Sequence, residues 1–238
     1  MPSKPPAPAA NRLLAALPRK DRERFMVACE RVDLQYAGVL AEAGEISHHA
    51  YFPTGALISL IAPIDGHAAL QVGLVGDEGM LGMPLFLGVG ASPLRAVVQG
   101  SGKALRIGAA AFRREIGSSP ALVRLLERYL YVMAAQFAQT AVCTRFHVVQ
   151  ARLARWLLMM HDRAYSDALH ITQEFLAYML GVRRVGVTRA ASALKQRGLI
   201  AYHRGDIMIM DRAGLEAAAC GCYAADKLLY ACVLADHP

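Results

Sequence analysis

The sequence predicts an α+β fold with three consecutive parts: an antiparallel β-roll, one long helix, and two short helices followed by a β-hairpin. From Val32 to Ile107, short apolar runs alternate with Gly, Pro and Asp, which is typical of a roll or barrel of short strands. After Pro120, the chain contains neither Gly nor Pro until Gly181, which leaves room for a long helix. Between His170 and Asp211, two helical patterns meet at a glycine and lead into alternating strands.

Composition and charge narrow the class of partner. The chain has 238 residues, of which 55% are hydrophobic, so it can build two modest domains. Its net charge of +7 favours a polyanionic partner or an anionic membrane surface. The basic excess is greatest from His147 to Arg212, where ten Lys and Arg stand against five Asp and Glu. The uncharged stretches Gly79–Leu94 and Tyr129–Thr144 are too short for a membrane span, so no membrane partner is predicted.

The first ten residues and the spacing of the cysteines indicate the cellular compartment of the protein. Residues 1–10 are rich in Pro and Ala, and we expect a disordered lead. They lack the apolar segment of a secretory signal, which favours a cytoplasmic protein. The five cysteines show no paired CxxC spacing, so reduced thiols are expected rather than a disulfide framework: Cys29, Cys143, Cys220, Cys222 and Cys232.

Residues 11–118 are predicted to form the β-roll as a sensor domain, preceded within this range by two small helices. Asn11 can cap the first helix, and the second follows Pro18. Residues 119–145 are predicted to form the long helix. One seam on it recurs at alternating spacings of four and three residues: Leu122, Leu126, Tyr129, Met133, Gln136, Thr140 and Cys143.

Two interpretations of this seam remain open. It is either buried against the roll of its own chain, or it forms a parallel coiled-coil contact in a dimer. The second interpretation assigns the dimer interface to Leu122, Leu126, Tyr129 and Met133. A further helix over His147–His161 is expected to open the next domain, with Arg152 and Arg155 on a solvated face.

Residues 146–215 are predicted to form a winged helix-turn-helix. Thr172 is placed to cap the first helix, with Ile171 and Leu176 in contact across the cap. Gly181 lies where a tight turn between helices needs a residue that tolerates a positive φ. A second helix begins near Arg183, and two strands joined at Arg204-Gly205 form the wing. Residues 216–238 follow as a C-terminal helical extension.

The second helix of this pair has two different faces. Its packing face carries Val187, Ala190 and Leu194. The opposite face carries Arg184, Val185, Thr188, Arg189, Ser192 and Lys195. A DNA major groove admits such a helix, and an arginine there can donate two hydrogen bonds to guanine O6 and N7. The cap, turn, basic face and wing occur in the right order for sequence-specific binding to double-stranded DNA.

At these residues the sequence resembles the Crp/Fnr family of bacterial transcription regulators, and the resemblance covers nearly the whole chain. The segments that carry it are HVVQARLARWLLMMHDR, TQEFLAYMLGVRRVGVTRAA and GLIAYHRGDIMIMD. The resemblance implies a cyclic-nucleotide-binding-like β-roll, a long dimerisation helix and a Crp-type winged helix-turn-helix. It also implies a homodimer on a pseudo-palindromic operator, contact with RNA polymerase in an activator, and a protein that is not an enzyme. No cofactor is expected.

The resemblance carries specific DNA contacts over to this chain. The family's base-contacting positions fall on Arg184, Val185 and Arg189. Its phosphate-contacting positions fall on Thr172, Gln173, Arg183 and His203. Val185 stands where the best-known members have Glu, which accepts from cytosine N4, so the operator should differ at that position.

The roll departs from the family's cyclic-nucleotide site, which holds the phosphate with a short helix opening Gly-Glu-Leu and the arginine of Arg-Ser-Ala. Here Glu78-Gly79-Met80 replaces the first motif. Ser92 falls near the arginine position, and Arg95 should face the opposite side of its strand. We expect the phosphate-facing helix to begin instead with Asp77 and Glu78, whose carboxylates would repel an anion. The site is therefore predicted to be degenerate, with no effector assigned.

Two other classes of function fit the sequence less well. One is an effector-binding or redox signalling protein with a vestigial DNA module, against which Arg184 and Arg189 argue. The other is a cupin-type enzyme, which needs an HxH…Glu…His pattern that the sequence lacks.

Metal and iron–sulfur sites are likewise not predicted. An Fnr-type iron–sulfur cluster needs four thiolates, and the N-terminal region offers only Cys29. Cys220-Gly-Cys222 is expected to have a structural role rather than to bind metal, and no ligation is expected from His48, His49 or His67.

Overall fold

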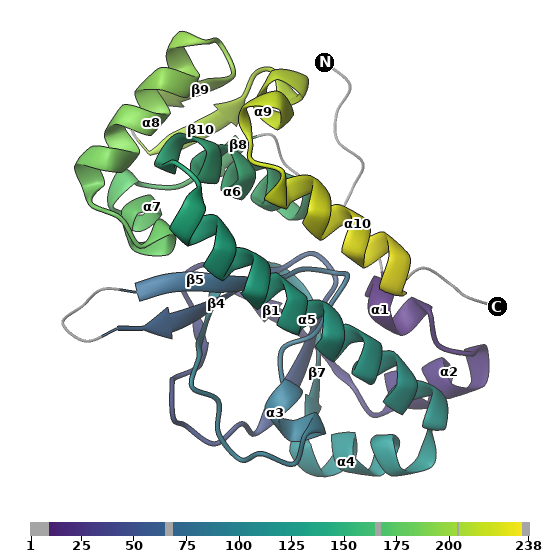
Figure 1. Ribbon diagram of the computed structural model, residues 1–238. Coiled ribbons are helices and arrows are strands. Elements are labelled where there is room, and N and C mark those ends of the chain that lie inside the picture. The colour runs from purple at the N-terminus through teal and green to yellow at the C-terminus, as the bar shows by residue number, and fades with distance from the viewer. Residues whose placement is uncertain (1–9, 65–68, 165–167, 204, 235–238) are drawn as a thin grey trace.

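The computed structural model describes residues 10–64, 69–164, 168–203 and 205–234. The β-roll packs against one side of the long helix α5 (Pro120–Phe146), and a smaller domain of helices and short strands lies at the far end of that helix (Figure 1). This order of elements confirms the predicted α+β fold. Of the predicted disordered lead, residues 1–9 lie outside the described residues.

Two antiparallel sheets form the roll. One has the strand order β1-β7-β3 and the other β2-β6-β4-β5. Strand β4 pairs with β5 from Ile58 opposite Val75 to Pro63 opposite Ala69, so these two strands make the hairpin that faces the C-terminal domain. The strands are β1 (Glu30–Leu34), β2 (Val39–Ala41), β3 (His49–Pro53), β4 (Leu57–Pro63), β5 (Ala69–Val75), β6 (Arg95–Gly100) and β7 (Gly102–Gly108).

Short helices close the ends of the roll, namely α1 (Arg12–Ala15), α2 (Arg19–Val27) and α4 (Ala109–Ser118). Asn11 caps α1 by accepting from the Leu14 amide at 3.0 Å, as predicted. Its side-chain amide also donates to the carbonyls of Pro53 and Gly79, each at 2.9 Å. This single buried side chain therefore fixes the N-terminus of the domain to two segments of the roll.

The predicted seam of α5 is buried within the same chain. The exposed fractions of its first four side chains are 1%, 0%, 0% and 4%: Leu122, Leu126, Tyr129 and Met133. They belong to the core of the roll, where the Tyr129 hydroxyl donates to the Met80 carbonyl at 3.2 Å. A Cβ at Gly79 would lie 2.3 Å from that hydroxyl, so only glycine fits there. Because these four side chains have almost no surface left, a partner chain could not contact them.

The opposite face of α5 carries exposed apolar and small side chains. We call this set the outer stripe: Tyr131, Ala134, Ala138, Ala141, Val142 and Phe146. Tyr131 is 61% exposed and Phe146 is 73% exposed, which is unusual for large apolar side chains. The outer stripe runs along the helix with the same helical period as the buried seam.

The C-terminal domain is built around α6 (Val149–Ala164). Its core holds, among others, Leu153, Leu157, Leu176, Val187 and Leu194. The same apolar cluster includes Leu57, Ile61, Ala69 and Leu74 from β4 and β5, and Trp156 donates to Gln71 at 2.8 Å. The remaining elements are β8 (Ala168–His170), α7 (Gln173–Leu180), α8 (Arg184–Gln196), β9 (Ile200–His203), β10 (Asp206–Ile209), α9 (Arg212–Ala218) and α10 (Cys222–Leu234).

Asp77 and Glu78 do not begin the short helix of the roll, so that prediction is wrong. The helix there, α3 (Met83–Phe86), starts after Gly82 with Pro84 in its first turn, where proline is well tolerated. Both carboxylates precede it and are buried. Asp77 pairs with Arg12 at 2.9 Å, and Glu78 pairs with Arg163 of α6 at 2.6 Å. They therefore face other helices.

Arg152 and Arg155 were expected on a solvated face of α6, and this expectation is also wrong. Both residues are buried, with exposed fractions of 8% and 7%. Arg155 pairs with Asp226 of α10 at 2.6 Å, and Arg152 donates to the carbonyl of Leu180. Their polar partners come from distant parts of the sequence, which is why the sequence pattern alone suggested a solvated face.

In the described part of the chain, no single helix meets the length and hydropathy requirements for crossing a membrane. Helices α9 and α10 meet these requirements only as a pair, and they are bent by 105° relative to each other.

Candidate nucleic-acid interface

The turn between α7 and α8 has the geometry that the sequence predicts. The Thr172 hydroxyl accepts from the Phe175 amide at 3.2 Å and so caps α7. Gly181 ends α7 with φ of +61°, a left-handed conformation that favours glycine. The buried side chains of Ile171 and Leu176 lie on either side of the cap. These local features fix the angle at which α8 leaves α7.

Helix α8 separates a packed face from an exposed face. Val187, Ala190 and Leu194 are buried in the domain core. Arg184, Val185 and Arg189 are exposed, and Val185 keeps 56% of its surface. Among the described residues, no carboxylate forms an ion pair with Arg183, Arg184 or Arg189. The start of α8 therefore presents guanidinium groups whose donors are available to a ligand.

Contacts between elements hold this face in place. The Thr188 hydroxyl of α8 donates to the side-chain oxygen of Gln173 at 2.6 Å, which links α8 to the start of α7. Tyr202 of β9 lies within interaction distance of the Gln173 backbone and of Arg184, and burial raises the pKa of its phenol. Tyr202 could not be recognised from the sequence, because its position next to α8 depends on how the wing folds back.

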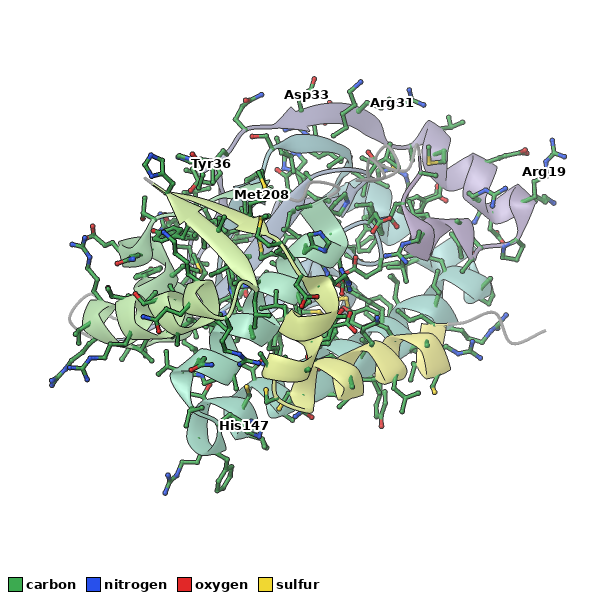
Figure 2. All side chains as sticks on the ribbon, turned by 90° about the horizontal axis from the view of Figure 1, so that it is seen from above. Arg19, Arg31, Asp33, Tyr36, His147 and Met208 are labelled. Atoms are coloured by element: carbon green, nitrogen blue, oxygen red, sulfur yellow. The ribbon has the colours of Figure 1, made fainter. Side chains whose placement is uncertain are left out.

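The two predicted strands of the wing are β9 and β10, and the structure adds β8 to them in an antiparallel sheet of order β8-β10-β9. His203, a predicted phosphate contact, is exposed at the end of β9. Gly205 has φ of +93° at the tip, whereas Arg204 lies outside the described residues. Met208 lies on β10 with 47% of its surface exposed (Figure 2). Thr172 and Arg183 are also exposed.

The roll contains a small cavity next to the segment that would hold a cyclic nucleotide. Its volume is about 140 Å³, whereas sites for small molecules usually measure roughly 300–1,000 Å³. Ser92, His48, His49 and the carboxylate of Glu45 are among its lining residues, and Arg95 is not. Arg95 instead forms an ion pair with Glu42 at 2.9 Å. His67 lies outside the described residues.

Comparison with protein families identifies the C-terminal domain. Residues 151–218 match the model of the Crp-like helix-turn-helix domain. This part of the chain is a Crp-like helix-turn-helix domain. The match spans α6, the turn between α7 and α8, the wing and α9, so the exposed arginines of α8 lie within the Crp-like domain. No curated protein sequence matches the chain significantly.

Solved structures extend the similarity to about four fifths of the chain. The c-di-GMP responsive global regulator CLP of Xanthomonas campestris is 18% identical, with a TM-score of 0.67 over 81% of this chain and 99% of that one. FixK2 from Bradyrhizobium japonicum is 13% identical, with a TM-score of 0.68 over 81% and 98%. TTHA1359, a CRP/FNR-family regulator from Thermus thermophilus, is 22% identical, with a TM-score of 0.67 over 80% and 98%. The roll and the long helix that precede the Crp-like domain thus share the fold of these solved structures.

Four side chains that the sequence analysis did not connect meet outside this interface. Cys143 and His147 come from the end of α5, and Cys220 and Cys222 come from the link between α9 and α10. The cysteine pair and the α5 residues are separated by more than seventy positions, so no local spacing could reveal the cluster.

Proposed function

We propose that the chain is a homodimeric, sequence-specific regulator of transcription that acts in the cytoplasm on a pseudo-palindromic operator. The observation that carries this proposal is the exposed arginine face of α8 within a Crp-like domain. In such a domain the second helix enters the major groove, and its first residues reach the base edges. As an activator, a protein of this kind would also contact RNA polymerase. Catalysis has no part in this proposal.

The individual roles are carried over from the matching positions of the Crp/Fnr family, and the placement of the residues supports them. Arg184, Val185 and Arg189 lie on the exposed face of the first two turns of α8 and are proposed to read bases. Thr172, Gln173, Arg183 and His203 surround this face at the start of α7, before α8 and on the wing, and are proposed to contact phosphates. The apolar Val185 suits contact with a thymine methyl group, which a carboxylate would not make.

The proposed dimer contact uses the outer stripe of α5 rather than the buried seam. Two copies related by a two-fold axis would bring their stripes together along the length of α5. The small side chains of Ala134, Ala138 and Ala141 would let the helices approach closely, and Tyr131 and Val142 would pack into the partner. In such a dimer, we expect the two α8 helices to meet successive major grooves about 34 Å apart.

Replacing Arg184 or Arg189 by Ala should weaken binding to the selected operator by roughly 1–3 kcal/mol and relax base preference at one position. Replacing Arg183 should weaken binding to all sequences alike and reduce the slope of log affinity against log salt by about one unit. The operator is first selected from random DNA with the native protein, and each variant is then titrated against it and against single-base variants.

Arg31→Ala is the matched control, because it removes the same charge from an exposed position on β1, away from α8 (Figure 2). It should leave the selected motif and the affinity unchanged. If Arg184→Ala selected the same motif as the native protein, Arg184 would not read bases.

Neither cyclic AMP nor cyclic GMP should bind tightly or change the affinity for the operator. The roll cavity is small, and its lining includes Glu45 but not Arg95, so a buried phosphate would have no guanidinium partner. Helix α3 has only four residues and cannot supply a substantial dipole in compensation. Titration calorimetry checks this prediction, and a dissociation constant at or below the micromolar range for either nucleotide would contradict it.

A further inference from the structure

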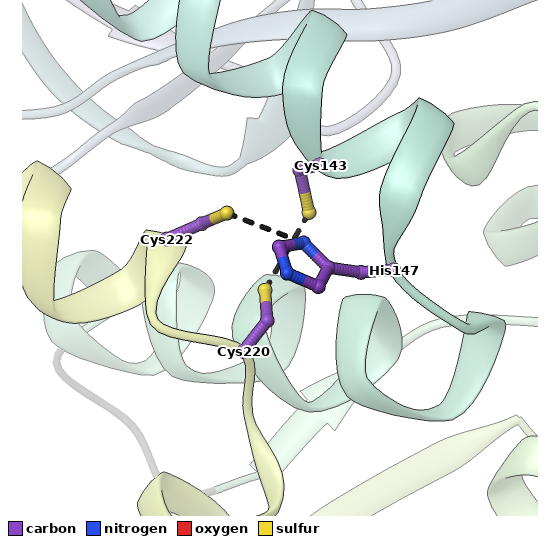
Figure 3. Close-up of side chains that lie close together, drawn as sticks. All are labelled: Cys143, His147, Cys220 and Cys222. Atoms are coloured by element: carbon purple, nitrogen blue, oxygen red, sulfur yellow. Dashed lines mark hydrogen bonds between the residues drawn. The ribbon is translucent and has the colours of Figure 1, made fainter.

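The cluster of Cys143, His147, Cys220 and Cys222 has the geometry of a metal site (Figure 3). Its four ligand atoms all lie within 4.8 Å of one another. The sulfurs of Cys143 and Cys220 are 3.5 Å apart, and the Cys222 sulfur is 3.4 Å from His147 Nδ1. A disulfide bond would need about 2.05 Å, so these are separate thiols.

The backbone explains why these side chains converge. Cys143 and His147 are four residues apart at the end of α5, and this spacing places them on one side of the helix. Cys220 and Cys222 flank Gly221 where α9 passes into α10. The packing of α10 along α5 brings the two pairs together. His147, at the C-terminal end of α5, is labelled in Figure 2. Cys143 and Cys222 are buried, whereas His147 and Cys220 are half-buried.

The charges around the cluster favour thiolates. Arg152 and Arg155 are buried beside it, and both interact electrostatically with Cys143. Asp226 neutralises one of these two positive charges, which leaves one positive charge in a largely buried site.

We propose that these four side chains bind one zinc ion in a closed tetrahedral Cys₃His site. With Zn–S bonds of about 2.3 Å, a tetrahedral site has edges of about 3.8 Å, which the observed separations can reach with small side-chain movements. Zinc with three thiolates and a neutral imidazole has a net charge of −1, which balances the remaining positive charge of Arg152, Arg155 and Asp226. Binding releases the protons of the thiols to solvent. An iron–sulfur cluster would need its ligands farther apart, because several iron and sulfide atoms would separate them.

The position of the site defines its role. All four ligands come from the protein and are at least half-buried, so the zinc is structural rather than catalytic. The zinc ion would connect the segment between α9 and α10 to the C-terminal end of α5, next to the start of α6. Zinc would thus stabilise the orientation of α5, which carries the outer stripe, relative to the C-terminal domain, which carries α8.

Elemental analysis of the full chain, purified under reducing conditions without chelator, should find one zinc per chain. Cys220→Ser and Cys222→Ser should each reduce this to below about a tenth. Cys29→Ser and Cys232→Ser are matched controls, because these cysteines lie outside the cluster, and they should keep the full amount. Removing zinc from the native protein with a chelator should lower Tm by about 10 °C.

Cobalt substitution tests the ligand set without relying on variants that lose the metal. Co²⁺ in the native chain should give the intense visible bands of a tetrahedral site and sulfur-to-metal charge transfer. His147→Cys should retain the metal and raise the charge-transfer intensity by about a third, because four thiolates replace three. The proposal is overturned if the reduced chain binds neither metal, if the control variants lose zinc as well, or if iron and sulfide are found instead.

Discussion

Ala138→Glu should convert the proposed dimer into a monomer and lower the affinity for the full operator by about 10²–10⁴-fold. Ala138 lies in the middle of the outer stripe, and a two-fold contact there would bury two carboxylates side by side in an apolar interface. Each monomer could then hold only one half-site, so the gain from simultaneous binding to two half-sites would be lost. Sedimentation and operator titration measure both effects.

Ala217→Glu provides the control, because it makes the same change at an exposed position of α9 that is not part of the outer stripe. It should leave the chain dimeric and the affinity within about twofold. A dimer that survives Ala138→Glu at micromolar concentration would rule out the outer stripe as the contact. Leu126→Glu is not an equivalent test, since Leu126 is fully buried in the roll and its replacement should unfold that domain.

Arg163→Ala should lower the free energy of unfolding by about 3–5 kcal/mol. The Arg163 guanidinium pairs with Glu78 at 2.6 Å, with only 10% and 8% of the two side chains exposed. Burial alone would lower the pKa of Arg163, but the carboxylate of Glu78 outweighs it and the pKa is raised. Removing the arginine leaves a buried carboxylate with a weaker partner in Arg12, 3.7 Å away. Denaturant unfolding followed by circular dichroism measures the change.

A double variant separates the charge from the packing. Glu78→Gln combined with Arg163→Met leaves no isolated charge and keeps most of the volume, so it should cost less than Arg163→Met alone. A loss below about 1 kcal/mol for Arg163→Ala, or a double variant less stable than Arg163→Met, would show that the pair does not stabilise the fold.

The helix-turn-helix could be predicted from the sequence because its determinants are local. The cap at Thr172 and the left-handed turn at Gly181 each depend on residues within a few positions along the chain. The two faces of α8 follow from helical periodicity alone. The proposed base contacts were carried over from the family to this exposed face, and the DNA titrations test them directly.

The role of α5 could not be decided in this way. Its buried seam and its outer stripe repeat with the same helical period, so the apolar pattern does not say which face meets the roll and which faces outward. The burial of Leu126 and the exposure of Tyr131 depend on where the roll packs. The burial of Arg155 and the cysteine cluster could not be predicted for a related reason. Asp226 lies far from Arg155 in the sequence, and Cys220 lies far from Cys143. Each pair comes into contact only when α10 packs against α5 and α6.

The shared core between the β4–β5 hairpin and the Crp-like domain affects how the chain folds. Leu57, Ile61, Ala69 and Leu74 belong to the roll by sequence, yet they lie in the same apolar cluster as Leu157 and Leu176. A fragment that starts at residue 146 would expose the apolar surface that these strands cover and would tend to aggregate. We therefore expect the hairpin and the C-terminal domain to unfold as one cooperative unit, because their shared core joins segments about a hundred residues apart in the sequence.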